Sequence, residues 1–183
     1  MLTGTLLELA STFCAKYPTS ALAQRLIPVL FSSPADLRRI STAPSPLFVC
    51  ATLLAIAGAA LRISCYRALG EFFTLNIAIR ENHRLVTHGP YAFVRHPSYP
   101  AVMATVLAVP LCAVAPGTYW AEMGLGRTSF GRVATGYWVL ATLGTSMLFV
   151  RAFEEERALS KVFGEEWGAY TRRVRYRFIP GIY

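Results

Sequence analysis

The sequence predicts an all-α fold, a polytopic transmembrane helical bundle of about four to five membrane helices. Of the 183 residues, 54% are hydrophobic and 15% are charged, whereas roughly a quarter of the residues of a soluble domain are charged. The mean hydropathy is +0.42. No segment alternates between apolar and polar residues strongly enough to predict a strand.

The N-terminal part contains two short apolar stretches, TGTLLELASTFCA and ALAQRLIPVLF, interrupted by Lys16, Pro18 and Arg25. They are compatible with two short helices, one interfacial helix or an added membrane span. Glu8 lies within the first stretch and no basic region precedes it, which argues against a secretory signal.

Three longer stretches approach the about 20 apolar residues that a helix needs to cross a bilayer. They cover residues 45–64, 99–117 and 133–153. Between the second and third lies GLGRTSFG, residues 124–131, which does not fit a GxGxxG fingerprint and is interpreted as a turn.

The basic residues orient this array. The connection 62–96 holds Arg62, Arg67, Arg80, Arg84 and Arg95, and the tail from residue 151 onward is also rich in basic residues. The loop 118–132 holds only Arg127 and Arg132. By the positive-inside rule, the connection and the tail therefore share the cytosolic side.

The net charge of +8 does not indicate a nucleic-acid partner. Its basic residues alternate with apolar stretches and form no single stripe, so they are better interpreted as topology and headgroup charges. The four cysteines are scattered, and no disulfide framework is expected.

The segment HRLVTHGPYAFVRHPSYP, residues 83–100, places stiff polar residues directly before the second apolar stretch. Gly89-Pro90 predicts a turn. Pro97 and Pro100 are tolerated near a helix start, which Ser98 could cap. The amides and dipole of such a helix N-terminus favour an anion.

Side chains of the same segment suit a ligand that has an anionic group and a flat or cationic part. Arg95, His96 and Tyr99 offer donors, and Tyr91 and Phe93 add aromatic walls. An anchor at headgroup depth remains open, because Arg, His and Tyr are common there. The three histidines have no acid or cysteine interleaved at ligand spacing, so no metal is expected.

A second constellation, RAFEEERALSKVFGEEWGAYTRRVRYRF, follows the third apolar stretch over residues 151–178. Arg151 and Glu155 are four residues apart and share a helix face. An Arg at the inner end of a span is costly unless it is paired or used, and Glu155 is the candidate partner. An ordinary solvated face remains open for this run of charges.

An interfacial amphipathic helix is expected from the spacing of a set of apolar residues. These are Leu159, Phe163, Trp167, Tyr170 and Val174.

The order and separation of HRLVTHGPYAFVRHPSY and RAFEEERALSKVFGEEWGAYTRRV resemble the isoprenylcysteine carboxyl methyltransferase family. This family lies within a wider group of membrane methyltransferases that includes phospholipid N-methyltransferases. LGEFFTLNI (69–77) and FIPGIY (178–183) are weaker signatures of it. The similarity covers roughly residues 58–183, and residues 1–44 are expected to be variable N-terminal helices of one membrane domain that spans residues 1–183.

The resemblance implies S-adenosylmethionine as the methyl donor, bound in a cytosolic pocket that the loop and the C-terminal helix form. It implies that Arg151 holds the substrate, and that Arg151 and Glu155 are the catalytic pair. The cofactor contacts that it implies are His83, Arg84, Leu85, Val86, Tyr91, His96, Pro97, Ser98, Tyr99 and Glu155.

The expected reaction is methylation of the C-terminal carboxylate of a prenylated cysteine, on a CaaX-processed protein or on a free prenylcysteine, at the endoplasmic reticulum. Three alternatives remain open. They are phospholipid headgroup N-methylation, a membrane sterol reductase that uses NADPH, and a membrane protein without enzymatic activity. The C-terminal FGEEWGAYTRRVRYRFIPGIY is also similar to the sterol reductases.

Overall fold

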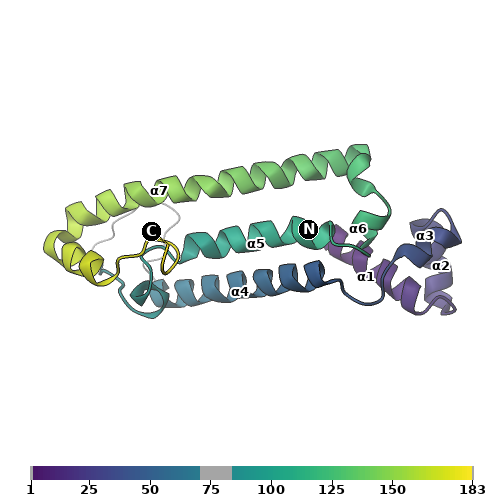
Figure 1. The fold of residues 1–183 in the computed structure, drawn as a ribbon, viewed down its shortest axis with the longest axis horizontal. Coiled ribbons are helices and arrows are strands. Elements are labelled where there is room, and N and C mark those ends of the chain that lie inside the picture. Colours follow the sequence, from purple (N-terminus) through teal and green to yellow (C-terminus); the bar gives the residue numbers. More distant parts are fainter. Residues whose placement is uncertain (1, 71–83, 183) are drawn as a thin grey trace. The chain divides into compact units, whose positions relative to one another are not determined.

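The structure is a computed structural model that describes residues 2–70 and 84–182. Over these residues it consists of helices joined by loops and turns, with one isolated bridge between Ile179 and Ile182 (Figure 1). The fold class is therefore all-α, as predicted. The elements in chain order are α1 (Leu2–Lys16), α2 (Ala21–Leu30), α3 (Pro34–Arg39), α4 (Pro46–Leu69), η2 (Gly89–Ala92), α5 (Ser98–Ala113), α6 (Tyr119–Glu122), η3 (Leu125–Arg127) and α7 (Ser129–Arg173).

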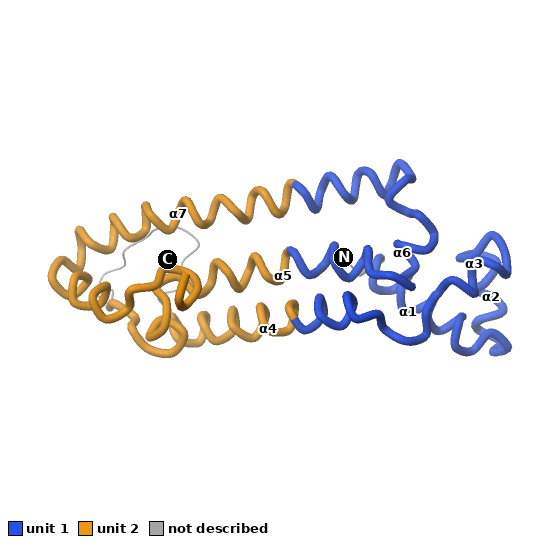
Figure 2. Tube along the Cα trace, viewed as in Figure 1, with its two compact units in different colours: residues 1–53, 107–139 blue, residues 54–106, 140–183 orange. Residues whose placement is uncertain are grey.

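The chain divides into two compact units, which Figure 2 shows in different colours. Unit 1 comprises residues 1–53 and 107–139, and unit 2 comprises residues 54–106 and 140–183. The three longest helices, α4, α5 and α7, each contribute to both units. The expectation of one domain over residues 1–183 stays a prediction.

Two helices, α4 with 24 residues and α7 with 45, are long and apolar enough to cross a membrane. Helix α7 contains the third predicted stretch, and α4 contains the first except for Ser45. The second corresponds to α5, whose 16 residues extend about 24 Å, less than the ~30 Å hydrocarbon core. A bundle with more than two membrane helices therefore stays a proposal.

The N-terminal part of unit 1 consists of three short helices of 15, 10 and 6 residues. Ser20 and Ser33 cap α2 and α3, since their hydroxyls accept hydrogen bonds from Ala23 N–H and Asp36 N–H. The helices enclose a small apolar core. Its buried residues are Cys14, Ala23, Phe31 and Ile40.

The segment 117–131 of unit 1 connects α5 to α7 through turns. Thr118 caps α6, and the Thr128 hydroxyl accepts a hydrogen bond from Gly131 N–H at 3.0 Å, at the start of α7. Gly124 has a φ of 61°, which favours glycine. The turn predicted for residues 124–131 is present over residues 124–128, whereas residues 129–131 already belong to α7.

Helix α7 continues from its apolar part through the charged segment as far as Arg173. Residues 151–163 contain neither Pro nor Gly, so nothing in them interrupts the helix. At Gly164 the backbone bends, with φ 46° and ψ −111°. The left-handed φ at this position explains why glycine stands there.

Past this bend, unit 2 has a second small core. Trp167, Tyr170 and Val174 are buried and pack with Leu85, Leu159 and Phe163. The spacing of these residues does produce an apolar face, as predicted. In the structure this face packs partly on the loop residue Leu85, and its location at the membrane interface stays a prediction.

Helices α4 and α5 pack closely within unit 2. A Cβ atom added at Gly58 would lie 2.7 Å from the Ala101 carbonyl oxygen and 3.0 Å from Thr105 Cγ2. The close approach holds the start of α5, and with it the polar loop 84–97, against α4.

Candidate functional site

The loop 84–97 of unit 2 has the sharp turn that Gly89-Pro90 predicts. Gly89 has a φ of 60°, and a Cβ there would lie 3.4 Å from Ala68 Cβ on α4. Pro90 is in the first turn of η2, where a missing amide hydrogen costs nothing. The loop then runs into α5 through Pro97, which is fully buried.

The first turn of α5 differs from the prediction in one respect. The helix begins at Ser98 itself, so Ser98 lies inside the first turn and Pro97 precedes the helix. The Ser98 hydroxyl accepts a hydrogen bond of 3.4 Å from the Arg62 guanidinium on α4. Ser98 therefore joins the loop to α4 instead of capping α5.

His96 lies between two neighbouring carboxylates of α7. Its Nε2 is 3.2 Å from Glu156 Oε1 and its Nδ1 is 3.6 Å from Glu155 Oε2. Only 4% of the His96 side chain is exposed. An ionised carboxylate can only accept a hydrogen bond, so the proton in the Nε2–Glu156 contact belongs to the ring.

Tyr99 joins the same group from the first turn of α5. Its hydroxyl donates a hydrogen bond of 2.5 Å to Glu155 Oε2, and its ring stacks on His96 with centroids 5.5 Å apart. The Arg151 guanidinium is close enough to interact electrostatically with this hydroxyl. Loop, α5 and α7 thus bring Arg151, Glu155, His96 and Tyr99 together within unit 2.

Glu156 forms the most enclosed part of the network. Besides His96, it contacts Arg95 Nη1 at 3.2 Å and Arg177 Nε at 3.1 Å. Burial opposes ionisation of Glu156, but the hydrogen bond from His96 and the charges of Arg95 and Arg177 outweigh it, so its pKa is lowered. Glu156 is therefore ionised at neutral pH.

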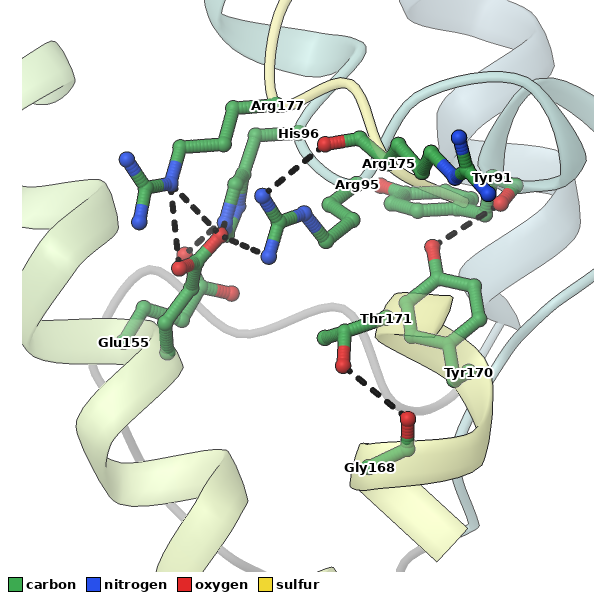
Figure 3. A network of polar contacts seen from close by, with 10 residues as sticks. Tyr91, Arg95, His96, Glu155, Gly168, Tyr170, Thr171, Arg175 and Arg177 are labelled. Carbon is green, nitrogen blue, oxygen red and sulfur yellow. Dashed lines mark hydrogen bonds and ion pairs between the residues drawn. The ribbon is translucent and has the colours of Figure 1, made fainter. Parts of the chain in front are cut away.

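The C-terminal segment after α7 pairs with the loop (Figure 3). Arg95 N–H donates to the Tyr176 carbonyl at 3.0 Å and His96 N–H donates to the Arg177 carbonyl at 2.8 Å. The Arg95 guanidinium also donates to the Arg175 carbonyl at 3.2 Å. The C-terminal segment thereby fixes the backbone of the loop at Arg95 and His96.

Tyr91 and Tyr170 anchor the other end of the loop. The Tyr170 hydroxyl donates a hydrogen bond of 2.8 Å to the Tyr91 carbonyl, and both rings are buried (Figure 3). Burial is the main reason that the pKa of Tyr170 is raised to about 12 and that the pKa of Tyr91 is raised as well. Both hydroxyls are neutral at physiological pH and act as structural groups.

A pocket of about 500 Å³ lies beside the loop in unit 2. Its volume is within the range of small-molecule sites. Its walls are apolar except for Arg84 and His88. The lining residues are Ala68, Leu69, Gly70, Arg84, Leu85, Val86 and His88.

The residues predicted to bind a cofactor fall into three groups in the structure. Arg84, Leu85 and Val86 line the pocket, whereas His96 and Tyr99 belong to the network around Glu155. The third group shapes the loop: Tyr91 and Pro97 are buried in it, and Ser98 is hydrogen-bonded to Arg62. His83 lies outside the described residues.

Glu156, Arg177 and Phe178 belong to the network although the sequence did not point to them. Phe178 packs against His96, Tyr99 and Phe149 with centroids 5.9, 6.4 and 4.8 Å apart. The run EEE contained the signal for Glu156, but it could not show which of the three carboxylates faces the loop. Nothing local to the sequence indicates the contacts of Arg177 and Phe178.

These observations define a class of protein: a helical chain with long apolar helices and a polar, partly enclosed site where one of those helices becomes charged. Residues 51–133 match the family model of the isoprenylcysteine carboxyl methyltransferase (ICMT) family. The match confirms the resemblance to this family over those residues. With the two long apolar helices, the match indicates a membrane protein.

The chain is also similar to one curated protein over a short stretch. The stretch covers 39 residues at 49% identity, and the relative is described as a probable 7-dehydrocholesterol reductase of Acanthamoeba polyphaga mimivirus. It represents 21% of this chain and 9% of the relative. The chain thus matches less than a tenth of that relative's length.

Proposed function

We propose that the chain is an integral membrane methyltransferase that methylates the C-terminal carboxylate of a prenylated cysteine with S-adenosylmethionine. The observation that supports this proposal best is the group formed by His96 and Tyr99 with Glu155 of α7, beside Arg151. The two sequence blocks that resemble the family meet in this group. The family match supports the same reaction class.

The residues present fit the proposed donor. The pocket offers apolar walls for a purine, and Arg84 and His88 are polar groups at its edge. The Arg95 Nε is buried and has no hydrogen-bond partner among the described residues. A guanidinium N–H of this kind suits an anionic acceptor, for example the carboxylate of the amino-acid part of S-adenosylmethionine.

S-adenosylmethionine supplies an electron-poor methyl group when it is bound. Arg84, Leu85, Val86, His96 and Tyr99 would hold it, with Glu155 available for its ammonium group. Tyr91, Pro97 and Ser98 would shape the loop around it. His83, for which the resemblance implies a further contact, lies outside the described residues.

The acceptor needs no general base, because a C-terminal carboxylate with an ordinary pKa of about 3.3–3.7 is already ionised at neutral pH. Arg151 would bind it as a bidentate fork, which aligns the oxygen and removes its water. The prenyl chain would lie along the apolar helices, at about 0.8 kcal/mol per buried methylene.

We further propose that the partner is a prenylated, CaaX-processed protein or a prenylcysteine at the endoplasmic reticulum. Residues 62–96 and the C-terminal tail would face the cytosol, where such acceptors are exposed. The distribution of basic residues over the loops supports this orientation.

The test measures radiolabelled methyl transfer to a farnesylated cysteine analogue in membranes that contain the chain. Arg151→Ala is expected to abolish transfer, and Arg151→Lys to leave a small fraction of it, since lysine lacks the fork. Arg157→Ala, an exposed arginine of the same helix, is the matched control. Near-normal turnover in both Arg151 variants would refute its role, and transfer to ethanolamine lipids alone would refute the carboxylate as acceptor.

The 39-residue similarity favours a second candidate, a membrane reductase that uses NADPH. The two candidates require different ligands, so binding of S-adenosylhomocysteine and of NADPH to the purified chain separates them. Saturable binding of S-adenosylhomocysteine without NADPH binding supports methyl transfer. The reverse result supports reduction.

A further inference from the structure

The C-terminal segment has a second connection to the site besides its backbone. Arg177 Nε donates to both oxygens of Glu156, at 3.1 Å to Oε2 and 3.3 Å to Oε1. Its guanidinium also lies over the Phe153 ring, 4.6 Å from the centroid. The side chains of Arg177 and Glu156 are 17% and 12% exposed, so water competes little for this contact.

The contact with Arg177 fixes the orientation of the Glu156 carboxylate. With both oxygens on Arg177 Nε, the carboxylate presents Oε1 to His96 Nε2 at 3.2 Å. Arg95 Nη1 approaches the same Oε1 at 3.2 Å. Without Arg177, rotation of the carboxylate would be limited by contacts to one oxygen only.

The orientation of Glu156 decides what His96 can do. A neutral imidazole has one N–H donor and one acceptor, and the partner of one nitrogen determines the tautomer. Because Nε2 faces Glu156, Nδ1 is directed at Glu155, the carboxylate that also binds Tyr99. The ring of Phe178, the residue after Arg177, packs at a tilt beside the rings of His96 and Tyr99.

We propose that Arg177 is a positioning residue of the methyl-transfer site, which acts through Glu156 to hold the His96 ring and its tautomer against Glu155. The role in methyl transfer rests on the proposed function, but the effect on His96 does not. Arg177 acts through its two hydrogen bonds to Glu156, so its influence on the reaction is indirect.

The chain permits a direct measurement, because it contains only three histidines. The full-length chain, labelled with ¹⁵N-histidine in detergent micelles, is compared by NMR as wild type, Arg177→Ala, Arg177→Lys and Arg175→Ala. His96→Asn assigns the His96 ring signals. Arg175 is the matched control because its side chain is exposed and only its carbonyl takes part in the network.

Arg177→Ala is expected to shift the His96 ring nitrogens, Arg177→Lys to restore them in part, and Arg175→Ala to leave them unchanged. Unaltered His96 signals in Arg177→Ala would overturn the proposal. Glu156→Gln provides a second route if Arg177→Ala does not fold. It retains the shape of Glu156 but removes its charge, and it should shift the same signals.

Methyl transfer by the same variants separates the two proposals. A displaced site is expected to lower kcat by up to about 100-fold in Arg177→Ala, whereas Arg175→Ala stays within about twofold of wild type. A wild-type chain that transfers no methyl group refutes the proposed function and leaves the His96 result standing. An active wild type with equal kcat in Arg177→Ala and Arg175→Ala overturns the positioning role.

Discussion

At the scale of single residues, two adjacent carboxylates have different environments. The Glu155 side chain is 33% exposed and contacts His96 and Tyr99. The Glu156 side chain is 12% exposed and is surrounded by Arg95, His96 and Arg177. Glu155 is therefore available to a ligand, whereas the contacts of Glu156 are all made within the protein.

Tyr99→Phe tests the role of Glu155. The variant retains the ring that stacks on His96 but removes the hydroxyl that donates to Glu155 at 2.5 Å. Hydrogen bonds to charged groups contribute roughly 1.5–3 kcal/mol, so methyl transfer should fall by about tenfold or more. Tyr137→Phe, an exposed tyrosine of α7, is the control. Equal turnover in both variants would contradict a role for this hydrogen bond.

Glu156→Gln tests the pH dependence of stability. The folded-state pKa of Glu156 lies below its ordinary value of 4.5. The stabilisation of the folded protein by ionised Glu156 is therefore complete above the unfolded-state pKa of this residue. It is lost as the pH falls through the folded-state pKa. Wild type should lose thermal stability on acidification below about pH 4.5, and Glu156→Gln should be less stable at pH 7 with a flatter profile.

Thermal unfolding in detergent between pH 3 and pH 7 provides the measurement, with the exposed Glu154→Gln as the control. The loss in Glu156→Gln at pH 7 is expected to be roughly 1.5–3 kcal/mol. Parallel pH profiles for wild type and Glu156→Gln would show that Glu156 does not cause the acid sensitivity.

At the scale of elements, glycines at two positions shape unit 2. Gly58 permits α4 and α5 to approach closely, and Gly164 permits α7 to bend towards the loop. Both features affect the site, because α5 presents Tyr99 and the end of α7 packs on Leu85. Gly144 of α7 has open surroundings and Gly168 makes only an ordinary contact, so these two glycines serve as controls.

Gly58→Ala should destabilise the helix pair. Its Cβ would lie 2.7 Å from a backbone oxygen, which cannot move without displacing α5. Overpacking of this kind costs roughly 1–3 kcal/mol. Gly144→Ala, whose Cβ would have no neighbour within 4 Å, should instead gain from helix propensity. Chemical denaturation followed by circular dichroism measures both, and equal stability would contradict the close packing.

Gly164→Ala should distort the bend of α7. An L-residue at a φ of 46° costs roughly 1–2 kcal/mol. The buried Trp167 follows the bend, so its fluorescence should become more accessible to acrylamide in a Trp120→Phe, Trp138→Phe background. Gly168→Ala is the control, since its Cβ would make only an ordinary contact of 3.5 Å with Arg172. Equal quenching in both variants would exclude strain at Gly164.

The sequence predicts those elements whose signals are local. Hydropathy located α4, α5 and the apolar part of α7, and Gly89-Pro90 located the turn of the loop. Hydropathy could not show that α7 continues to Arg173, because charged residues form helices as readily as apolar ones do. The periodicity of the last apolar face was correct, but periodicity does not distinguish lipid from protein as the partner.

In the site, too, features with a local sequence signal could be predicted, whereas features that depend on tertiary contacts could not. The pairing of the two blocks was inferred from loop charges and from resemblance, and the contacts of His96 and Tyr99 with Glu155 agree with it. The role of Arg177 depends on an ion pair with Glu156, 21 residues away, and on backbone pairing with the loop 80 or so residues earlier. Such contacts depend on tertiary structure and have no pattern in the sequence.

At the scale of the whole molecule, the contacts of unit 2 restrict how the chain can cross a membrane. The loop before α5 is hydrogen-bonded to the tail after α7, so both lie on one side. None of the most apolar 18 residues of α7 is buried, which suits a helix in lipid. If α7 crosses the membrane, the chain must already have crossed it once between the loop and the start of α7. Among the described helices of that segment, α5 is the one whose length comes near to a membrane crossing.

Crossing by α5 has a modest physical cost. Its 16 residues are a few ångströms shorter than a typical hydrocarbon core, a mismatch that a bilayer accommodates by thinning at fractions of a kcal/mol per ångström. Residues 114–116 continue its apolar character beyond the last helical turn. The opposite-side loop is then residues 118–132, which holds few basic residues, as the positive-inside rule requires.

Cysteine labelling in sealed microsomes tests this topology. Ser129→Cys and Ser160→Cys replace exposed serines at the start of α7 and in its charged part. Cys50 and Cys112 are replaced by alanine, whereas Cys14 and Cys65 stay because they are fully buried. A membrane-impermeant maleimide should label Ser160→Cys in intact vesicles and Ser129→Cys only after permeabilisation. Equal labelling of both in intact vesicles would mean that α7 does not cross, and the site would then need a different route for its lipid substrate.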